Sequence, residues 1–166
     1  MNRDLKRFER IVRSVGEELP KTRPDSAETS VWDELHPFET RNIHPDLPRK
    51  VRRLFDDGHY EQAVFEAFKF LESEVRRLSG LRGKTGYALM MAAFNETNAK
   101  VRINDLSTDS KVDEQRGYKC IFAGASAGIR NPRGHEVDMA DSPDEALDYL
   151  ALASLLLRRL DAAGLR

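Results

Sequence analysis

The sequence predicts an all-α fold, because several segments place apolar residues at helical spacing and carry helix-capping residues at their ends. The signals are clearest in the last segment, where Ser142, Pro143 and Glu145 combine a capping box with proline at the first helical position. The weak alternation between Lys100 and Asp113 is compatible with a short strand or an irregular loop, so no strand is predicted there. We expect a bundle of helices around one core.

The first part of the chain differs in character from the rest. Residues 5–19 place apolar side chains at helical spacing on a charged segment, which predicts an amphipathic helix. Residues 20–33 are polar and contain proline, which is typical of a linker or an extended arm. Within this arm, Trp32 is expected to anchor onto the chain's own core, since its apolar area is large. Residues 1–41 are therefore assigned to an N-terminal helix and polar arm, and residues 42–166 to a helical domain.

Two histidines, His36 and His44, each precede a proline in the segment that follows. The prolines prevent a long helix here. A pair of histidines can indicate a metal site, but this spacing fits no recognised ligand pattern and no cysteine accompanies it. The sequence therefore predicts that both histidines are structural or exposed to solvent, and neither a metal nor another cofactor is expected.

Two helices are predicted next in the chain. The first covers Arg49–Asp57, and Gly58 is placed to end it in a left-handed cap. The second covers Tyr60–Ser79, has a sustained apolar stripe, and is closed by Gly80. Four charged residues near its end are interpreted as a solvated face, with the alternative that one of them reaches the segment around residue 130. These four are Glu72, Glu74, Arg76 and Arg77.

A compact apolar helix is predicted over Tyr87–Phe94, and the core helices are expected to begin near Arg49, Tyr60, Asp113 and Ser142. Additional leucines broaden the apolar stripe of the last helix beyond one face. Such a surface indicates either deep burial or contact with another chain, and both remain open.

The segment over residues 117–136, GYKCIFAGASAGIRNPRGHE, is where we expect function. Its small residues from Gly124 to Gly128 are poor helix formers, which makes sense where another backbone must come close. Cys120 lies in the same helical segment and is predicted to be a buried thiol. The apolar positions of the segment predict one buried face, which consists of Tyr118, Ile121, Phe122, Ala125 and Ile129.

Pro132 is expected to end or kink this helix around Arg130 and Asn131, because proline lacks an amide hydrogen and its ring clashes with the carbonyl four residues back. In an unbroken helix, Arg130 and His135 would point roughly 140° apart. A turn that contains Pro132 and Gly134 could bring both side chains to one place.

The whole-chain composition restricts the class of protein only loosely. The 166 residues are 40% hydrophobic, and 27 Lys and Arg against 28 Asp and Glu leave a net charge of −1. Nothing global therefore indicates nucleic-acid binding, and any basic surface must be local. One cysteine excludes an intrachain disulfide, and no apolar run is long enough for a signal peptide or a membrane span. A cytoplasmic protein without membrane contact is expected.

Four blocks of the sequence, taken in order, resemble the Ymh-type branch of the HEPN superfamily, a bacterial and phage group. They are GHYEQAVFEAFKFLESEVRRLSG, ALMMAAF, IFAGASAGIRNPRGHE and EALDYLALASLLLRRLD. The resemblance covers about Asn42 to Asp161, and Arg130, Asn131 and His135 match the superfamily signature of arginine, a polar residue, three further residues and histidine. It implies a HEPN-like helical bundle, to which the N-terminal helix and arm are additions.

The resemblance also implies a chemistry, which is metal-independent RNA cleavage by attack of the ribose 2′-hydroxyl on the adjacent phosphodiester. His135 would serve as general acid or base, since histidine titrates near neutral pH. Arg130 would stabilise charge on the phosphoryl oxygens. Asn131 would complete the catalytic set by orienting the histidine or the phosphate, and Arg133 would bind the RNA backbone. The structural alternative is that Arg130 and His135 bond to carbonyls at a helix end.

Two functions from different classes remain open at this stage. The first is a ribonuclease, which the resemblance associates with toxins and antiphage effectors and hence with an antitoxin or another defence-system protein. The second is a non-catalytic helical module that binds RNA or a partner protein. The small residues from Gly124 to Gly128 and the leucines of the last helix further predict a homodimer in which the two Arg130/His135 segments face each other.

Overall fold

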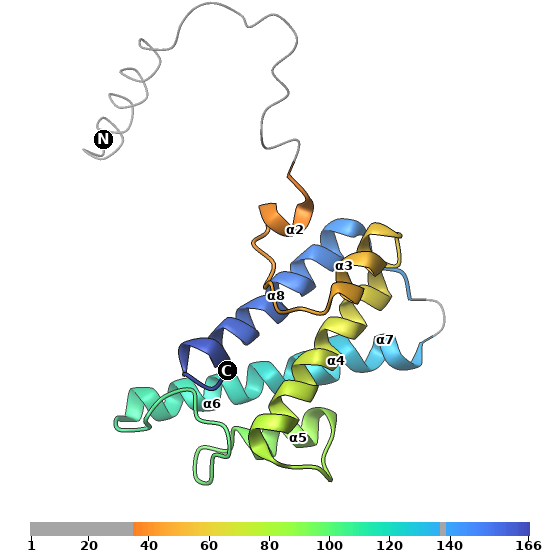
Figure 1. The fold of residues 1–166 in the computed structure, drawn as a ribbon. Coiled ribbons are helices and arrows are strands. Elements are labelled where there is room, and N and C mark those ends of the chain that lie inside the picture. Colours follow the sequence, from red (N-terminus) through yellow and green to blue (C-terminus); the bar gives the residue numbers. More distant parts are fainter. Residues whose placement is uncertain (1–34, 137–138) are drawn as a thin grey trace, which may run out of the picture. The chain divides into compact units, whose positions relative to one another are not determined.

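The computed structural model describes residues 35–136 and 139–166, and residues Leu35–Arg166 form one compact unit (Figure 1). The described residues form helices and loops without a strand, which confirms the predicted all-α class. The segment over 100–108 is accordingly an irregular loop. The amphipathic helix predicted over 5–19 and the predicted anchor Trp32 lie outside the described residues.

The helices follow one another along the chain with short connections. They are α2 (Pro37–Thr40), α3 (Arg49–Asp56), α4 (Tyr60–Ser79), α5 (Gly86–Ala93), α6 (Asp109–Ala125), the π-helical turn η2 (Ser126–Arg130), α7 (Asn131–His135) and α8 (Pro143–Ala162). The compact unit thus includes α2, whose Phe38 is buried in the core and which lies before residue 42.

Local signals place most helix ends. Ser142 accepts a hydrogen bond from the Glu145 amide and starts α8, and Gly80 ends α4 in the left-handed conformation with φ 70°. Gly58 follows α3 with φ 79°, as predicted. The start of α6 was predicted too late, near Asp113, because the Thr108 hydroxyl already accepts from the Lys111 amide and caps the helix there.

Helix α4 is the centre of the core and packs against α3, α5, α7, η2 and α8 (Figure 1). The stripes predicted on α4 and α8 are buried, from Ala63 and Leu71 on the first to Leu150 and Leu160 on the second. Leu147 and Leu156 of α8 are buried as well, whereas Leu155 is 53% exposed. The broad apolar surface of α8 is therefore used mainly in the chain's own core, which removes it as an argument for a dimer.

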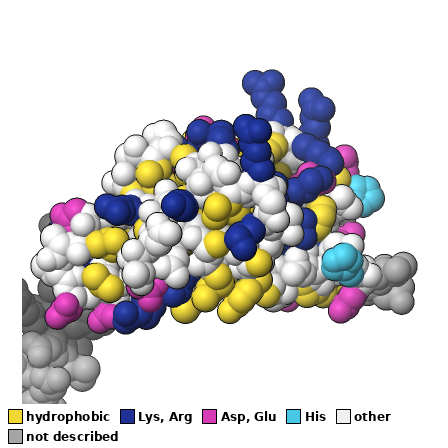
Figure 2. Space-filling view, turned by 90° about the horizontal axis from the view of Figure 1, so that it is seen from below, with side chains coloured by type: hydrophobic (Ala, Val, Ile, Leu, Met, Phe, Trp, Pro, Cys, Tyr) yellow, Lys and Arg dark blue, Asp and Glu magenta, His cyan; other side chains and the backbone are white. Residues whose placement is uncertain are grey.

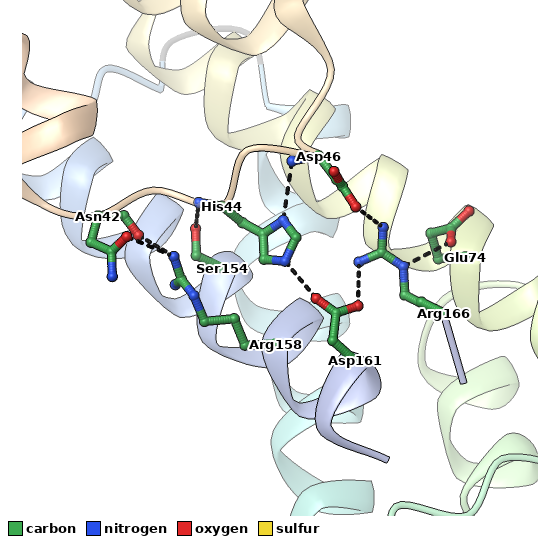
Figure 3. A network of polar contacts seen from close by, with 8 residues as sticks. All are labelled: Asn42, His44, Asp46, Glu74, Ser154, Arg158, Asp161 and Arg166. Carbon is green, nitrogen blue, oxygen red and sulfur yellow. Dashed lines mark hydrogen bonds and ion pairs between the residues drawn. The ribbon is translucent and has the colours of Figure 1, made fainter. Parts of the chain in front are cut away.

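The two histidines before proline are structural, as predicted. The backbone amide of His44 donates to Ser154 Oγ at 3.0 Å, its Nδ1 accepts from the Asp46 amide at 3.1 Å, and its Nε2 lies 2.7 Å from an Asp161 carboxylate oxygen (Figure 3). Because Nδ1 accepts a hydrogen bond, the ring hydrogen is on Nε2, which donates a hydrogen bond to the Asp161 carboxylate. His36 repeats the pattern with the Phe38 amide and Asp56.

A second set of polar contacts lies beside those of His44, at the same end of the core. Arg166 pairs with Asp46, Glu74 and Asp161, which come from three different parts of the chain (Figure 3). These contacts fix the segment before α3 against the ends of α4 and α8. The described helices include none that is both long and apolar enough to cross a membrane.

Candidate functional site: a buried carboxylate between two arginines

The helix that begins as α6 does not end around Arg130 and Asn131, which corrects the prediction of a helix end there. Residues Ser126–Arg130 form a π-helical turn in which the Asn131 amide donates to the Ser126 carbonyl, five residues back. The backbone then continues as α7 to His135 with Pro132 in its first turn, where a missing amide hydrogen costs least. The extra residue of the π turn thus accommodates the proline without a break.

Because the backbone stays helical, Arg130 and His135 are not brought to one place. Five residues of helix turn the two side chains roughly 140° apart. Arg130 lies over α4, whereas His135 is exposed at the end of α7. The turn that was predicted to join them is absent, so a single chain does not assemble the predicted arginine–histidine pair.

Arg130 instead joins a cluster on α4. Its Nη1 donates to Asn131 Oδ1 at 3.0 Å, and its Nε lies 3.8 Å from Glu72 Oε2. The guanidinium also lies over the Phe65 ring, 5.4 Å from its centre. The side chain of Glu72 is 5% exposed and that of Arg130 is 25% exposed. The prediction that Glu72 belongs to a solvated face was therefore wrong, and the alternative contact with the segment around residue 130 was right.

A second arginine binds the same carboxylate from the same helix. Arg76 Nη2 donates to Glu72 Oε1 at 2.5 Å, and Arg76 Nε donates to the Lys84 carbonyl at 3.4 Å. Glu72 is thus a buried anion between two guanidinium groups. We call Glu72, Arg76 and Arg130 the arginine–carboxylate cluster.

Three buried polar atoms at or beside this cluster have no hydrogen-bond partner within the described residues, namely Glu72 Oε2, Arg130 Nε and Ser126 Oγ. Ser126 is 4% exposed. Its hydroxyl faces the backbone of Gly86, where an added Cβ would lie 3.6 Å from Oγ. Buried polar groups without partners are rare in native structures and often accompany a bound water, ligand or functional role. These atoms therefore mark the junction of α4, α5 and η2 as the candidate site.

The surroundings of the cluster are basic. The Lys84 carbonyl accepts from Arg76, so the loop between α4 and α5, which also carries Arg82, runs beside the cluster. Figure 2 views the side on which α5 and α6 lie and shows Lys and Arg side chains mainly along one edge, with hydrophobic side chains in the middle of the face. Arg82 and Lys84 thus add basic residues beside the cluster on a chain of net charge −1.

Arg133 does not belong to this surface. Its Nε and Nη2 donate to the two oxygens of Asp141 at 2.7 and 2.6 Å, and its Nη1 donates to the Ile129 carbonyl. Its guanidinium also stacks on Tyr149, 4.3 Å from the ring centre. The two side chains of the ion pair are 3% and 4% exposed. The predicted RNA contact of Arg133 would require this pair to open, and the function proposed below does not use it.

The outward face of α6 and η2 carries small residues on which no other part of the described chain is packed. An added Cβ at Gly117, Gly124 or Gly128 would meet no atom within 4 Å. Ile121 is 45% exposed and Cys120 is exposed, so the predictions that these two side chains are buried were wrong.

The opposite face of α6 explains the reversal. There Gln115 is fully buried, because its amide donates to the Phe94 and Val101 carbonyls and its oxygen accepts from the Ile103 amide. Lys119 is buried nearby and pairs with Glu96 at 2.6 Å, a hydrogen bond that helps to lower the pKa of Glu96 to about 2. Because Gln115 and Lys119 occupy part of the buried face of α6, Ile121 lies on its exposed face.

Gly134→Ala should impair the site while the fold persists. An added Cβ would lie 2.9 Å from Phe65 Cε2, closer than real contacts allow, and Phe65 lies under the Arg130 guanidinium. The ring must therefore move and take Arg130 with it. We expect helical content unchanged in circular dichroism, whereas any activity that depends on the position of Arg130 should fall on the order of tenfold to a hundredfold. Full activity in this variant would show that the Phe65–Arg130 contact is immaterial.

The fold and the cluster define an all-helical domain that presents arginine side chains around a buried carboxylate. The chain belongs to the family described as "Protein of unknown function (Hypoth_ymh)", whose model matches residues 41–160. No curated protein matches the chain, and no solved structure does either. Any statement about function therefore depends on the geometry of the cluster and on the sequence resemblance.

Proposed function

We propose that this protein is a metal-independent RNA endonuclease of HEPN type, with Arg130 as the phosphate-binding catalytic residue. The observation that carries the proposal is the state of the Arg130 side chain. It is oriented by Asn131 Oδ1, Glu72 and the Phe65 ring, yet it is 25% exposed and its Nη2 makes no hydrogen bond within the described residues. An oriented guanidinium with unused donors is suited to bind a phosphodiester.

The reaction requires one proton to be removed and one to be delivered. The ribose 2′-hydroxyl loses its proton to a base and its oxygen attacks the adjacent phosphorus, while the bond from phosphorus to the 5′-oxygen breaks. The leaving oxygen takes up a proton, which leaves a 2′,3′-cyclic phosphate and a 5′-hydroxyl. His135 is proposed as the group that exchanges these protons, because histidine titrates near neutral pH. Arg130 would stabilise the charge that develops on the phosphoryl oxygens.

The proposed working unit is a homodimer, because one chain leaves His135 and Arg130 on different sides of a helix. A second copy could supply the missing histidine. The second copy is proposed to pack on the outward face of α6 and η2. Ile121 is exposed there, and the absence of side chains at Gly124 and Gly128 allows a second helix to approach closely. Arg130 follows Gly128 by two residues in the same continuous helical segment.

The test is cleavage of single-stranded RNA in EDTA. The wild type is expected to produce fragments that end in a cyclic phosphate, and His135→Ala is expected to produce none. His59→Ala is a matched control, because His59 is also exposed and makes no capping hydrogen bond with its side chain. If the wild type left the RNA intact while still binding it, a non-catalytic RNA-binding module would replace the enzyme. Equal cleavage by all three proteins would overturn the assignment of His135 as the proton-exchanging group.

A further inference from the structure

We propose that Arg76 is a second phosphate-binding residue and that Glu72 positions Arg76 and Arg130 as a two-arginine clamp on the RNA backbone. This inference rests on the proposed function, because it assumes that the ligand of Arg130 is RNA. It adds a binding residue on α4 and a positioning residue, neither of which belongs to the segment that carries the arginine–histidine signature.

The contacts of Arg76 leave part of its guanidinium available. Nη2 binds Glu72 and Nε binds the Lys84 carbonyl, whereas Nη1 makes no hydrogen bond within the described residues. The side chain is 33% exposed, comparable to Arg130 at 25%. Both arginines therefore have one side fixed by the protein and another side accessible. A long side chain that is already fixed loses less conformational entropy when a ligand binds, so the free-energy cost of binding is smaller.

The charges of the cluster also favour an anion. Two guanidinium groups share one carboxylate, so the cluster carries a net positive charge that one phosphate would neutralise. Glu72 is 5% exposed, and its Oε2 accepts no hydrogen bond within the described residues. Water therefore solvates the carboxylate poorly, and its negative charge depends on the two arginines for stabilisation. Arg130 Nε meets Glu72 at 3.8 Å, beyond hydrogen-bond distance, so the carboxylate does not use all of the arginine's donors.

The next residue along α4 provides a matched control. Arg77 is also an arginine on an exposed turn of the helix, but it pairs with Glu74 at 2.9 Å and is 58% exposed. Arg76 and Arg77 differ by about 100° around the helix axis. Of these two arginines, Arg76 pairs with Glu72 and Arg77 pairs with Glu74, so a general loss of positive charge from α4 can be separated from a loss at the cluster.

The binding experiment uses 2′-O-methyl RNA, which lacks the attacking hydroxyl and is not cleaved. Fluorescence anisotropy at several salt concentrations gives the slope of log K against log salt, which changes by about 0.7 for each phosphate contact on a single strand. Arg76→Gln is expected to reduce the slope by about that amount, Arg76→Lys to restore most of it, and Arg77→Gln to leave it unchanged. Thermal unfolding confirms that each variant is folded.

The positioning role of Glu72 is tested by Glu72→Gln, which keeps the size of the side chain and removes its charge. Both arginines remain, so the salt slope should change little, while kcat should fall on the order of tenfold to a hundredfold because the guanidinium groups are no longer aligned. A merely structural role would lower the melting temperature and leave kcat of the folded protein intact.

The outcomes separate this inference from the proposed function. If the wild type binds 2′-O-methyl RNA with the arginine dependence above but does not cleave unmodified RNA, the clamp stands and the enzyme fails. If Arg76→Gln and Arg77→Gln give the same slope as the wild type, the clamp is overturned even when cleavage is normal. Absence of RNA binding by the wild type would also overturn it.

Discussion

Arg133→Ala is expected to destabilise the Leu35–Arg166 unit by about 3–5 kcal/mol, because it leaves the carboxylate of Asp141 buried without its counter-ion. Burial of the guanidinium by itself would lower the pKa of Arg133, but the hydrogen bonds and charge of Asp141 outweigh it and the pKa is raised. Arg133 is therefore charged in the folded state. Urea denaturation monitored by circular dichroism measures the loss.

The control for this prediction is an exposed ion pair. Asp113 pairs with Arg116 at 2.6 Å, with the two side chains 70% and 52% exposed, so Asp113→Ala should cost no more than about 1 kcal/mol. Replacing both members of the buried pair, as in Arg133→Leu with Asp141→Leu, should recover much of the stability. A stable Arg133→Ala protein would mean that the segment around residue 133 opens readily, and Arg133 would then be accessible to RNA after all.

Sequence signals that act within one helix predicted the fold well. The α4 prediction, Tyr60–Ser79, matches the observed ends, because the left-handed glycine at its end and the apolar stripe are local features. The start of α8 follows in the same way from its capping box. Both signals depend only on residues within a few turns, so they do not require knowledge of the neighbouring helices.

The consequence of Pro132 could not be predicted from the helix rule alone. A proline removes one i→i−4 hydrogen bond, but the π turn over Ser126–Arg130 shifts the bonding to i→i−5 just before it. Whether a chain kinks or inserts a π turn depends on what packs against it. Here η2 packs against α4 and α5, and Gly134 packs against Phe65, so tertiary contacts support a backbone that stays helical through to His135.

The two buried polar sites were missed for a related reason. Glu72 follows buried Phe68 by four residues and precedes buried Val75 by three, so its helical position was an inward one although its charge indicated solvent. On α6, hydrophobicity assigned Ile121 to the core, whereas the core is occupied by Gln115 and Lys119. In both cases burial was predicted from the polarity of the side chain alone. A polar side chain can be buried when it has hydrogen-bond or ion-pair partners, and some of these partners lie on other helices or loops that the local sequence does not reveal.

Mixing two inactive variants should restore cleavage if the site forms across a dimer. Arg130→Ala and His135→Ala are each expected to abolish activity, yet their heterodimer would retain one site with an intact Arg130 from one copy and an intact His135 from the other. An equal mixture would then recover roughly a quarter of wild-type activity, since about half of the dimers are heterodimers and each has one working site. If both groups of a site came from one chain, mixing would recover nothing.

Gly124→Arg completes this test, because it should prevent pairing without damage to the monomer. Its Cβ would project into open space, and arginine is a better helix former than glycine, so the chain should fold at least as well. Light scattering is expected to report a monomer, and adding Gly124→Arg to both inactive variants should abolish their mutual recovery. Ala162→Arg, at an exposed position of α8, should leave the dimer intact. A Gly124→Arg monomer that cleaves RNA at the wild-type rate would refute the shared site.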